Sequence, residues 1–153
     1  MRKILLLMVA AAVALAAGCA GHAAKTKADV VTPGKQVKTL YIWDADGHTD
    51  LTLLRALKAG AKKELNTRGF IVTDDPNANE AFVKITVLDA FRDADKGKSY
   101  IKARMYFVDA MDNGVFYDKT AEARVSGHGE TVDYPVGALV TVLLSDYPAA
   151  GAK

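Results

Sequence analysis

The sequence predicts an α+β domain, with a mainly antiparallel sheet of four to five strands and two helices packed on one face of that sheet. Three observations predict this class. Apolar and polar residues alternate in several segments after residue 80, which is typical of half-buried strands. Residues 51–65 carry apolar residues at helical spacing, and the apolar residues 135–146 have a proline at their start that favours a second helix. Finally, Asn113-Gly114 is a hairpin turn signal between two alternating segments.

The first strand and the first helix are predicted in the segment that starts at Val37. Residues 37–43 are rich in β-forming side chains, and the acidic loop of residues 44–48 follows them. Thr49 or Asp50 is placed to cap the helix that comes next. The apolar stripe of this helix is expected to consist of Leu51, Leu54, Leu57, Ala61 and Leu65.

A glycine is expected to end this helix. Gly69 follows a basic stretch and precedes Phe70, so it fits the left-handed position of a Schellman ending, with Phe70 against Leu65. A short strand over residues 70–73 and a turn over residues 74–79 come next.

Three longer strands are predicted after this turn, over residues 81–91, 100–108 and 115–125. Asn113-Gly114 is expected to join the last two as an antiparallel pair. The side chains expected to share the apolar faces are Val83, Ile85, Val87 and Phe91 in the first strand and Ile101, Ala103, Met105 and Phe107 in the second.

The last apolar segment, residues 135–146, is compatible with a buried strand or a short helix. A helix is favoured because Pro135 fits its first position behind a cap at Asp133 or Tyr134. The β-branched residues of the segment favour a strand. The predicted order of elements is therefore β-α-β-β-β-β-α, with a helix as its last member.

The N-terminus resembles the export signal of bacterial lipoproteins. Arg2 and Lys3 precede an apolar run over residues 4–17 that is shorter than the ~20 residues of a membrane-spanning helix, and small residues lead to Cys19. The resemblance implies that residues 1–18 are removed and that Cys19 is acylated, so that a lipid bilayer is the first partner. Ala20 rather than Asp after the cysteine implies the outer membrane. We expect the domain to face the periplasm, and the sequence leaves the cell-surface orientation open.

Two alternatives to this anchor remain open at the level of sequence. Cleavage after the Ala14-Leu15-Ala16 segment would give an ordinary secreted protein with Cys19 as a free thiol. An uncleaved apolar segment would instead hold the chain in the membrane. Either outcome leaves the single cysteine of the chain without a lipid.

Composition points to a single neutral domain behind a tether. Residues 19–36 are small and polar and predict a flexible lipidated tether, and residues 37–153 form one α+β domain. Without Arg2 and Lys3, 18 of the 20 Lys and Arg residues remain against 18 Asp and Glu. Because the mature chain is neutral and has no basic run, nucleic acid is not an expected partner.

The sequence contains no convincing catalytic or metal-binding pattern, so we expect a protein that is not an enzyme and needs no cofactor. The segment Asp44-x-Asp46-Gly47-x-x-Asp50 has the first ligands of a calcium loop, but Arg55 stands where that loop requires a bidentate Glu. Helix capping is the favoured role of these carboxylates. The neighbouring Ser126 and His128 are expected to lie in a plain turn.

Aromatic residues on the strands form the best candidate for a functional surface. Alternation predicts that a set of large rings gathers on the sheet face away from the helices, where such rings suit a protein partner or form ordinary cross-strand pairs. This set consists of Tyr41, Trp43, Tyr100, Tyr106 and Tyr117.

Residues 40–91 resemble small outer-membrane lipoproteins, among them the surface-exclusion and complement-resistance lipoproteins of conjugative plasmids. The matching residues are Leu65, Gly69, Phe70, Val72, Asp75-Pro76, Ala81, Ile85 and Val87. The chain lacks the long apolar central segments of the surface-exclusion family, since only residues 92–99 separate its strands there.

The first functional hypothesis is a non-enzymatic envelope lipoprotein that acts as an interaction or structural module and binds another envelope protein. The alternative is a ligand- or metal-binding module, or a hydrolase, of the envelope. It would use Asp44, Asp46 and His48 of the loop that ends at Asp50, together with His128.

Overall fold

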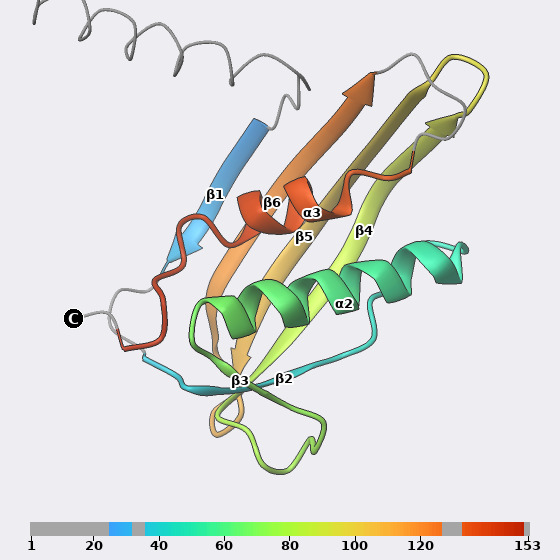
Figure 1. Ribbon diagram of the computed structural model, residues 1–153. Helices are drawn as coiled ribbons and strands as arrows, with labels where there is room; N and C mark the ends of the chain where they lie inside the picture. The colour runs from blue at the N-terminus through green and yellow to red at the C-terminus, as the bar shows by residue number, and fades with distance from the viewer. Residues whose placement is uncertain (1–24, 32–35, 127–132, 152–153) are drawn as a thin grey trace, which may run out of the picture.

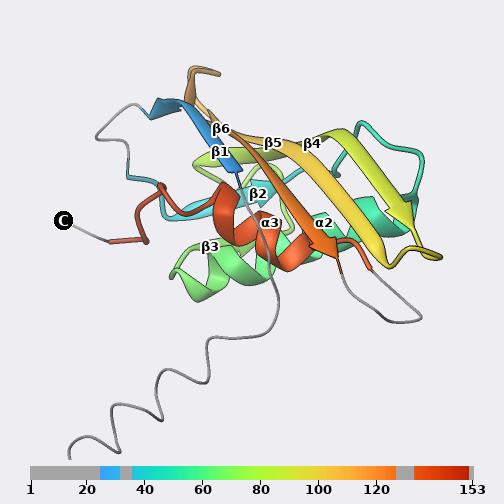
Figure 2. The ribbon, with the colours of Figure 1, turned by 90° about the horizontal axis from the view of Figure 1, so that it is seen from above.

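The domain has two layers, a twisted sheet and two helices that cover one face of it (Figure 1). The computed structural model describes residues 25–31, 36–126 and 133–151. The elements in chain order are β1 (Lys25–Val31), β2 (Thr39–Ile42), α2 (Leu51–Thr67), β3 (Ile71–Thr73), β4 (Ala81–Asp93), β5 (Lys98–Asp109), β6 (Val115–Ser126) and α3 (Val136–Leu143). Seen from above, both helices lie on the same side of the sheet (Figure 2).

The sheet confirms the predicted fold class. Its strand order is β1-β6-β5-β4-β2-β3. The β1/β6, β6/β5 and β5/β4 pairs are antiparallel, whereas β2 pairs parallel with both β4 and β3. The two parallel pairs arise because α2 carries the chain from β2 to β3 across the covered face. No helix in the described residues is both long and apolar enough to cross a membrane.

One strand lies where the sequence predicted a flexible tether. Residues 25–31 form β1, which pairs antiparallel with β6 from Lys25 opposite Glu122 to Val31 opposite Tyr117. The tether prediction was wrong for these residues, because the open edge of β6 offers N–H and C=O groups that a neighbouring extended segment satisfies. The described sheet therefore has six strands rather than four to five.

The start of α2 confirms one predicted cap and corrects the buried face. Asp50 is the cap, and its Oδ1 accepts hydrogen bonds from the backbone N–H groups of Thr52 at 2.9 Å and Leu53 at 3.2 Å. Leu51 is exposed and Leu54 only half-buried. Leu54 lies three residues before Leu57 and Leu53 lies four, and both distances place a side chain on the same helix face as Leu57. Spacing alone therefore could not show which of the two is buried. The fully buried stripe consists of Leu53, Leu57, Ala61 and Leu65.

The end of α2 is the predicted Schellman motif. Gly69 has φ +86° and donates its N–H to the carbonyl of Asn66 at 3.0 Å, and Phe70 donates to the carbonyl of Leu65 at 3.1 Å. Arg68, next to the glycine, donates from Nη1 to the carbonyls of Leu144 at 2.6 Å and Tyr147 at 3.2 Å. These bonds fasten the end of α2 to the segment that follows α3.

The inner face of the central strands matches the predicted alternation with one exception. Every inner-facing residue predicted on β5 is buried, as are Val83, Ile85 and Val87 on β4. Phe91 is 53% exposed, however, so its prediction as a core residue was wrong. The β4/β5 register shifts between Val87 and Asp89, and this bulge moves the later side chains to the opposite face.

The hairpin and the second helix form as the sequence favours. Asn113 adopts φ +59° in the turn between β5 and β6, where the Asp109 N–H donates to the Gly114 carbonyl at 2.9 Å. Residues 136–143 are helical, so the strand alternative is wrong. Pro135 is the N-cap of α3 rather than its first residue, and neither Asp133 nor Tyr134 caps it.

The loop before α2 is held against β4 at a glycine that no other residue can replace without strain. The backbone N–H of Asp46 donates to the Ile85 carbonyl at 3.1 Å, and the backbone carbonyl of Asp46 accepts from the Val87 N–H at 2.8 Å. Gly47 has φ +85°, and a Cβ there would lie 2.2 Å from the Val87 carbonyl oxygen.

We expect Gly47→Ala to lower the free energy of unfolding by about 2 kcal/mol, because it combines a left-handed backbone with a steric overlap. Gly137→Ala is the matched control, since a Cβ there meets no atom within 4 Å and alanine favours the helix. Urea unfolding of the two variants measures the difference. Equal stability of both variants would contradict this account of the loop.

Candidate functional site

The outer face of the sheet, which points away from α2 and α3, carries four of the five predicted aromatic residues. Tyr41 of β2 lies opposite Phe82 of β4, Tyr106 of β5 lies opposite Lys84 of β4, and Tyr100 lies opposite Phe91. Trp43 follows β2 on the same face. The predicted gathering of these four residues on one face is therefore correct.

Tyr117 does not belong to this face. It is fully buried under the helices, its ring centroid lies 5.1 Å from that of Phe107 and 4.9 Å from that of Tyr147, and its hydroxyl donates to the Leu143 carbonyl. Burial raises the pKa of its phenol. The placement on the outer face was wrong because Tyr117 pairs with the buried Phe107 of β5 and so faces the core.

Three rings form an aromatic cluster, which we define as Tyr41, Trp43 and Phe82. The Phe82 ring makes edge contacts with Tyr41 at 6.3 Å and with Trp43 at 5.7 Å between centroids. Trp43 is 47% exposed. Sequence reasoning missed Phe82, although its alternation with the inner-facing residues of β4 already placed it on the outer face. The cluster gives this end of the outer face an apolar centre.

Cations border the rings on the outer face. The Nζ of Lys84 lies 5.9 Å from the centroid of the Trp43 ring, and the guanidinium carbon of Arg104 lies 5.4 Å from that of Tyr106. Lys84 also lies 3.4 Å from Asp46, and its hydrogen bond with that carboxylate raises the lysine pKa. Arg104 binds Asp118 with two nitrogens. Aromatic residues and arginine are enriched at the centres of protein interfaces, and charged pairs occur at their polar rims.

The carboxylates of the acidic loop each have a partner within the fold. Asp44 pairs with Lys58 of α2 at 2.7 Å, which holds the pKa of that carboxyl below its usual value, while Asp46 faces Lys84 and Asp50 caps α2. His48 accepts the Asp50 N–H at its Nδ1 at 3.0 Å. In the described residues no group of three or more His, Cys, Asp or Glu side chains is placed to hold a metal ion.

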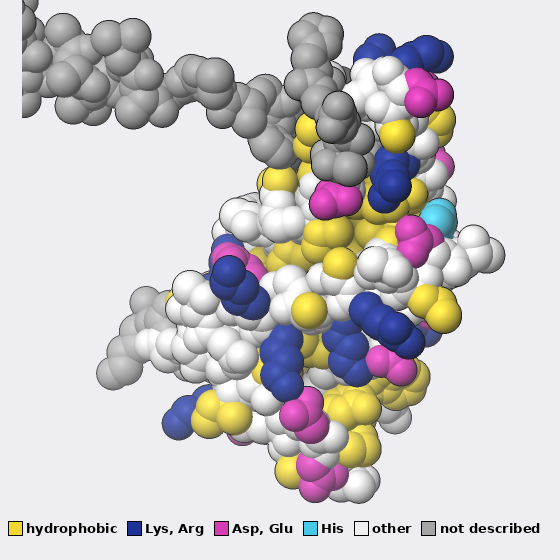
Figure 3. All heavy atoms as spheres, turned by 45° about the vertical axis from the view of Figure 1, so that its right-hand side comes forward, with side chains coloured by type: hydrophobic (Ala, Val, Ile, Leu, Met, Phe, Trp, Pro, Cys, Tyr) yellow, Lys and Arg dark blue, Asp and Glu magenta, His cyan; other side chains and the backbone are white. Residues whose placement is uncertain are grey.

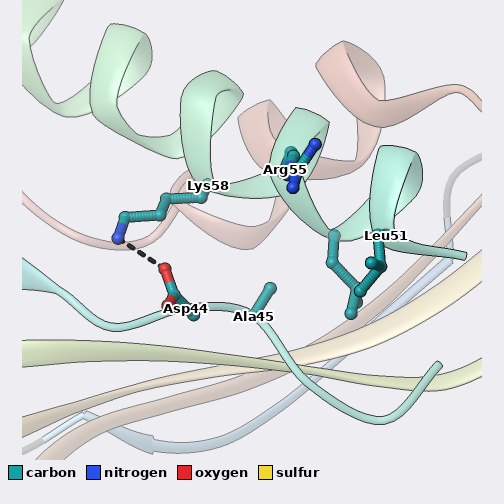
Figure 4. A pocket seen from close by; sticks show the side chains of 6 residues that line it. Asp44, Ala45, Leu51, Arg55 and Lys58 are labelled. Carbon is teal, nitrogen blue, oxygen red and sulfur yellow. Dashed lines mark hydrogen bonds and ion pairs between the residues drawn. The ribbon is translucent and has the colours of Figure 1, made fainter. Parts of the chain in front are cut away.

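A small pocket of about 240 Å³ lies between this loop and α2 (Figure 4). Lys58 reaches across to Asp44, whereas the guanidinium of Arg55 points away from Asp44. The lining consists of Asp44, Ala45, Leu51, Leu54, Arg55 and Lys58. Its volume is below the roughly 300–1,000 Å³ of typical ligand pockets. His128 of the ligand-binding alternative lies outside the described residues.

A wider hollow of about 470 Å³ lies between the starts of α2 and α3. Its charged groups already have partners, since Asp50 caps α2 and Arg92 lies 4.0 Å from Asp133. Over the rest of the helix layer, Lys and Arg side chains lie interleaved with Asp and Glu (Figure 3). One such pair joins Lys62 to Asp74 at 2.8 Å. These surfaces are therefore electrostatically balanced.

A buried lysine under α3 was not anticipated from the sequence. The Lys119 side chain is 1% exposed, and its Nζ donates to the Ser145 hydroxyl at 2.7 Å and to Asp146 at 2.6 Å. A serine beside a lysine is found in some hydrolases, but there the lysine acts as a neutral base. Here Lys119 donates to the Asp146 carboxylate, and this hydrogen bond lowers the pKa of Asp146. The pair joins β6 to the segment that follows α3.

Comparison with known proteins identifies the fold. No protein-family model and no curated protein matches the sequence. A dodecamer of PelC from Paraburkholderia phytofirmans superposes with a TM-score of 0.66 at 11% identity, covering 86% of this chain and 100% of that one. Lipoprotein GNA1162 from Neisseria meningitidis gives a TM-score of 0.51 at 14% identity, covering 71% and 93%. At these identities the comparisons show a shared fold.

A third solved structure with this fold is the hypothetical protein CT253 from Chlamydia trachomatis, with a TM-score of 0.51 at 13% identity over 71% of this chain and 92% of that one. The sequence resemblance of residues 40–91 to small bacterial lipoproteins is supported at the level of the fold, since lipoprotein GNA1162 shares it.

Proposed function

We propose that this chain is a non-enzymatic lipoprotein of the bacterial envelope that binds another envelope protein on the outer face of its sheet. In this proposal Cys19 carries the acyl chains, and the domain faces the periplasm from the outer membrane. The signal-like N-terminus supports the anchor. The shared fold with lipoprotein GNA1162 is consistent with it.

The observation that carries the proposal is the exposed aromatic cluster. Trp43 leaves about half of its surface in water although Phe82 and Tyr41 lie beside it, and the described helices lie on the opposite face. Trp and Tyr dominate the binding energy of protein interfaces because they bury a large area at small entropic cost. The ion pairs between Lys84 and Asp46 and between Arg104 and Asp118 supply the polar surroundings that such a centre requires.

A photoreactive phenylalanine analogue at Trp43 is expected to capture the partner in living cells. The matched control places the same analogue at Lys63, which is exposed on α2. We expect an adduct of defined mass from position 43 and none from position 63. Adducts of equal yield from both positions, or none from either, would contradict the proposed surface.

Truncation of Trp43 is expected to lower the affinity for the partner. Once the captured partner is purified, Trp43→Ala is expected to weaken its binding by at least about tenfold, whereas Leu51→Ala, which removes an exposed leucine on the helix side, leaves it unchanged. Titration calorimetry measures both variants. Equal affinities would show that the aromatic cluster is not the binding centre.

Self-assembly is a second candidate function, and two observations favour it. PelC from Paraburkholderia phytofirmans is a dodecamer, and the superposition with this chain covers 100% of the PelC chain. In the described residues β3 pairs only with β2, so its other edge is open, and Ile71 there is about half exposed. Native mass spectrometry of the detergent-extracted protein distinguishes the two functions. A closed oligomer supports self-assembly, and a monomer supports a different partner.

A further inference from the structure

The direction of β1 fixes which part of the domain lies closest to Cys19. Lys25 pairs with Glu122, and β1 runs antiparallel to β6, so the chain enters the sheet from the side where β6 ends (Figure 1). Ser126 at that end pairs with Lys98 at the start of β5. We call the β4–β5 turn with the strand ends beside it, residues 88–100, and the adjoining end of β6, residues 122–126, the anchor end of the sheet.

The chain between Cys19 and the sheet is short. Residues 20–24 separate Cys19 from Lys25, so the two Cα atoms are at most about 20 Å apart. Ser126, the last residue of β6, lies four residues beyond Glu122, which pairs with Lys25. This is about 13 Å along the strand, so the segment from Cys19 to Lys25 is long enough to reach the tip of the anchor end. Met111, in the hairpin at the opposite end, lies more than about 23 Å from the same level.

The anchor end exposes side chains that suit a membrane surface. Phe91 is 53% exposed and lies opposite Tyr100 on the outer face, and Leu88 at the bulge is about half exposed. The guanidinium carbon of Arg124 lies 5.0 Å from the centroid of the Tyr100 ring. Aromatic rings and long basic side chains are enriched where proteins meet the headgroup region, because each has an apolar body and a polar end.

We propose that this end of the sheet rests on the phospholipid surface to which Cys19 is anchored, with Phe91 and Leu88 in the interfacial region. The inference rests on the proposed acylation of Cys19. Three of the four cations of the anchor end are paired, Arg124 with Glu122 at 3.3 Å, Lys96 with Asp93 at 3.5 Å and Arg92 with Asp133 at 4.0 Å. The contact therefore depends on apolar side chains and persists in high salt. It leaves the aromatic cluster turned toward the periplasm for a protein partner.

Site-directed fluorescence on the acylated full chain tests the contact. Since Cys19 is the only cysteine and its sulfur is blocked by lipid, an added cysteine is the only free thiol. An NBD probe is attached at Phe91→Cys, and at Leu88→Cys as a second reporter. Met111→Cys, whose parent side chain is 93% exposed at the opposite end, is the control. The proteins are reconstituted into phosphatidylethanolamine and phosphatidylglycerol vesicles that contain a doxyl-labelled lipid quencher.

We expect a blue-shifted probe at positions 88 and 91, with doxyl quenching at least about twofold stronger than at position 111, in low and high salt alike. Equal quenching at the two ends would overturn the proposed orientation. A blue shift without doxyl quenching would show that protein covers this surface, and would overturn it as well. The unsubstituted protein reports separately on the anchor: if Cys19 itself takes up the probe, the acylation fails and the proposed function falls with it.

Discussion

Replacing Cys19 by alanine is expected to abolish incorporation of palmitate and to free the domain from membranes. Two or more acyl chains give essentially permanent anchoring, at about 0.8 kcal/mol for each buried CH₂ group. Metabolic labelling measures the lipid. Fractionation of cells that export the variant behind an ordinary cleavable signal measures the release, expected as at least about a tenfold fall in the membrane-bound fraction.

The control for this experiment is His22→Ala, in the same segment, which should leave labelling and membrane binding intact. Continued palmitate incorporation in the Cys19→Ala variant would contradict the anchor. Release of the unsubstituted protein by salt would contradict it in a second way, since only ionic contacts are weakened by salt.

Removing the partner of the buried lysine is expected to produce the largest loss of stability. Asp146→Ala leaves the Lys119 ammonium inside the fold with Ser145 as its remaining partner. Leaving a buried charge unpaired costs about 3 kcal/mol, the lower end of the usual range because Asp146 is itself half exposed. Urea unfolding at neutral pH measures the change.

Lys119→Met provides the matched comparison, because it removes the charge and keeps the volume. We expect it to change the free energy of unfolding by no more than about 1 kcal/mol. If Lys119→Met destabilises the domain as strongly as Asp146→Ala, the pair itself stabilises the fold and the unpaired charge does not explain the loss.

The same pair has a defined pH dependence. The bonds from Lys119 and from Ser145 lower the pKa of Asp146 in the folded state below its usual 3.8. The contribution of Asp146 to stability is therefore fully present above that value and is lost as the pH falls through the lowered folded-state pKa. The difference in stability between the unsubstituted protein and Asp146→Asn should accordingly narrow under strongly acidic conditions.

Local signals in the sequence predicted much of the fold correctly. The Gly69 ending of α2 and the Asn113-Gly114 hairpin each depend on a left-handed backbone that few residues adopt, so a short motif determines them. The inner face of β5 follows from simple alternation. These features need no knowledge of distant parts of the chain.

The wrong predictions concern features that depend on contacts between residues far apart in the chain. The strand β1 forms because β6 has an open edge, which no property of residues 25–31 reveals. The β-bulge after Val87 turns Phe91 outward, and one extra residue in a strand leaves no mark in the alternation pattern. Tyr117 faces the core because it pairs with Phe107 of β5, and that register depends on contacts between strands rather than on any short motif.

The sequence predicted which aromatic residues lie on the candidate surface, but it did not predict how they contact one another. Tyr41, Trp43, Tyr100 and Tyr106 lie on the outer face because alternation governs β2 and β5. The edge contacts of Phe82 with Tyr41 and Trp43 depend on the parallel pairing of β2 with β4, which the sequence did not predict. Pairing between strands, rather than the strands themselves, creates the aromatic cluster.

The mass of the mature N-terminal peptide, isolated from bacterial membranes, tests the central claim most directly. The account predicts a peptide that begins at Cys19 and carries acyl chains on its sulfur. A peptide that begins at another residue, or an unmodified Cys19 thiol, would contradict the claim that this domain works as a lipid-anchored module of the envelope.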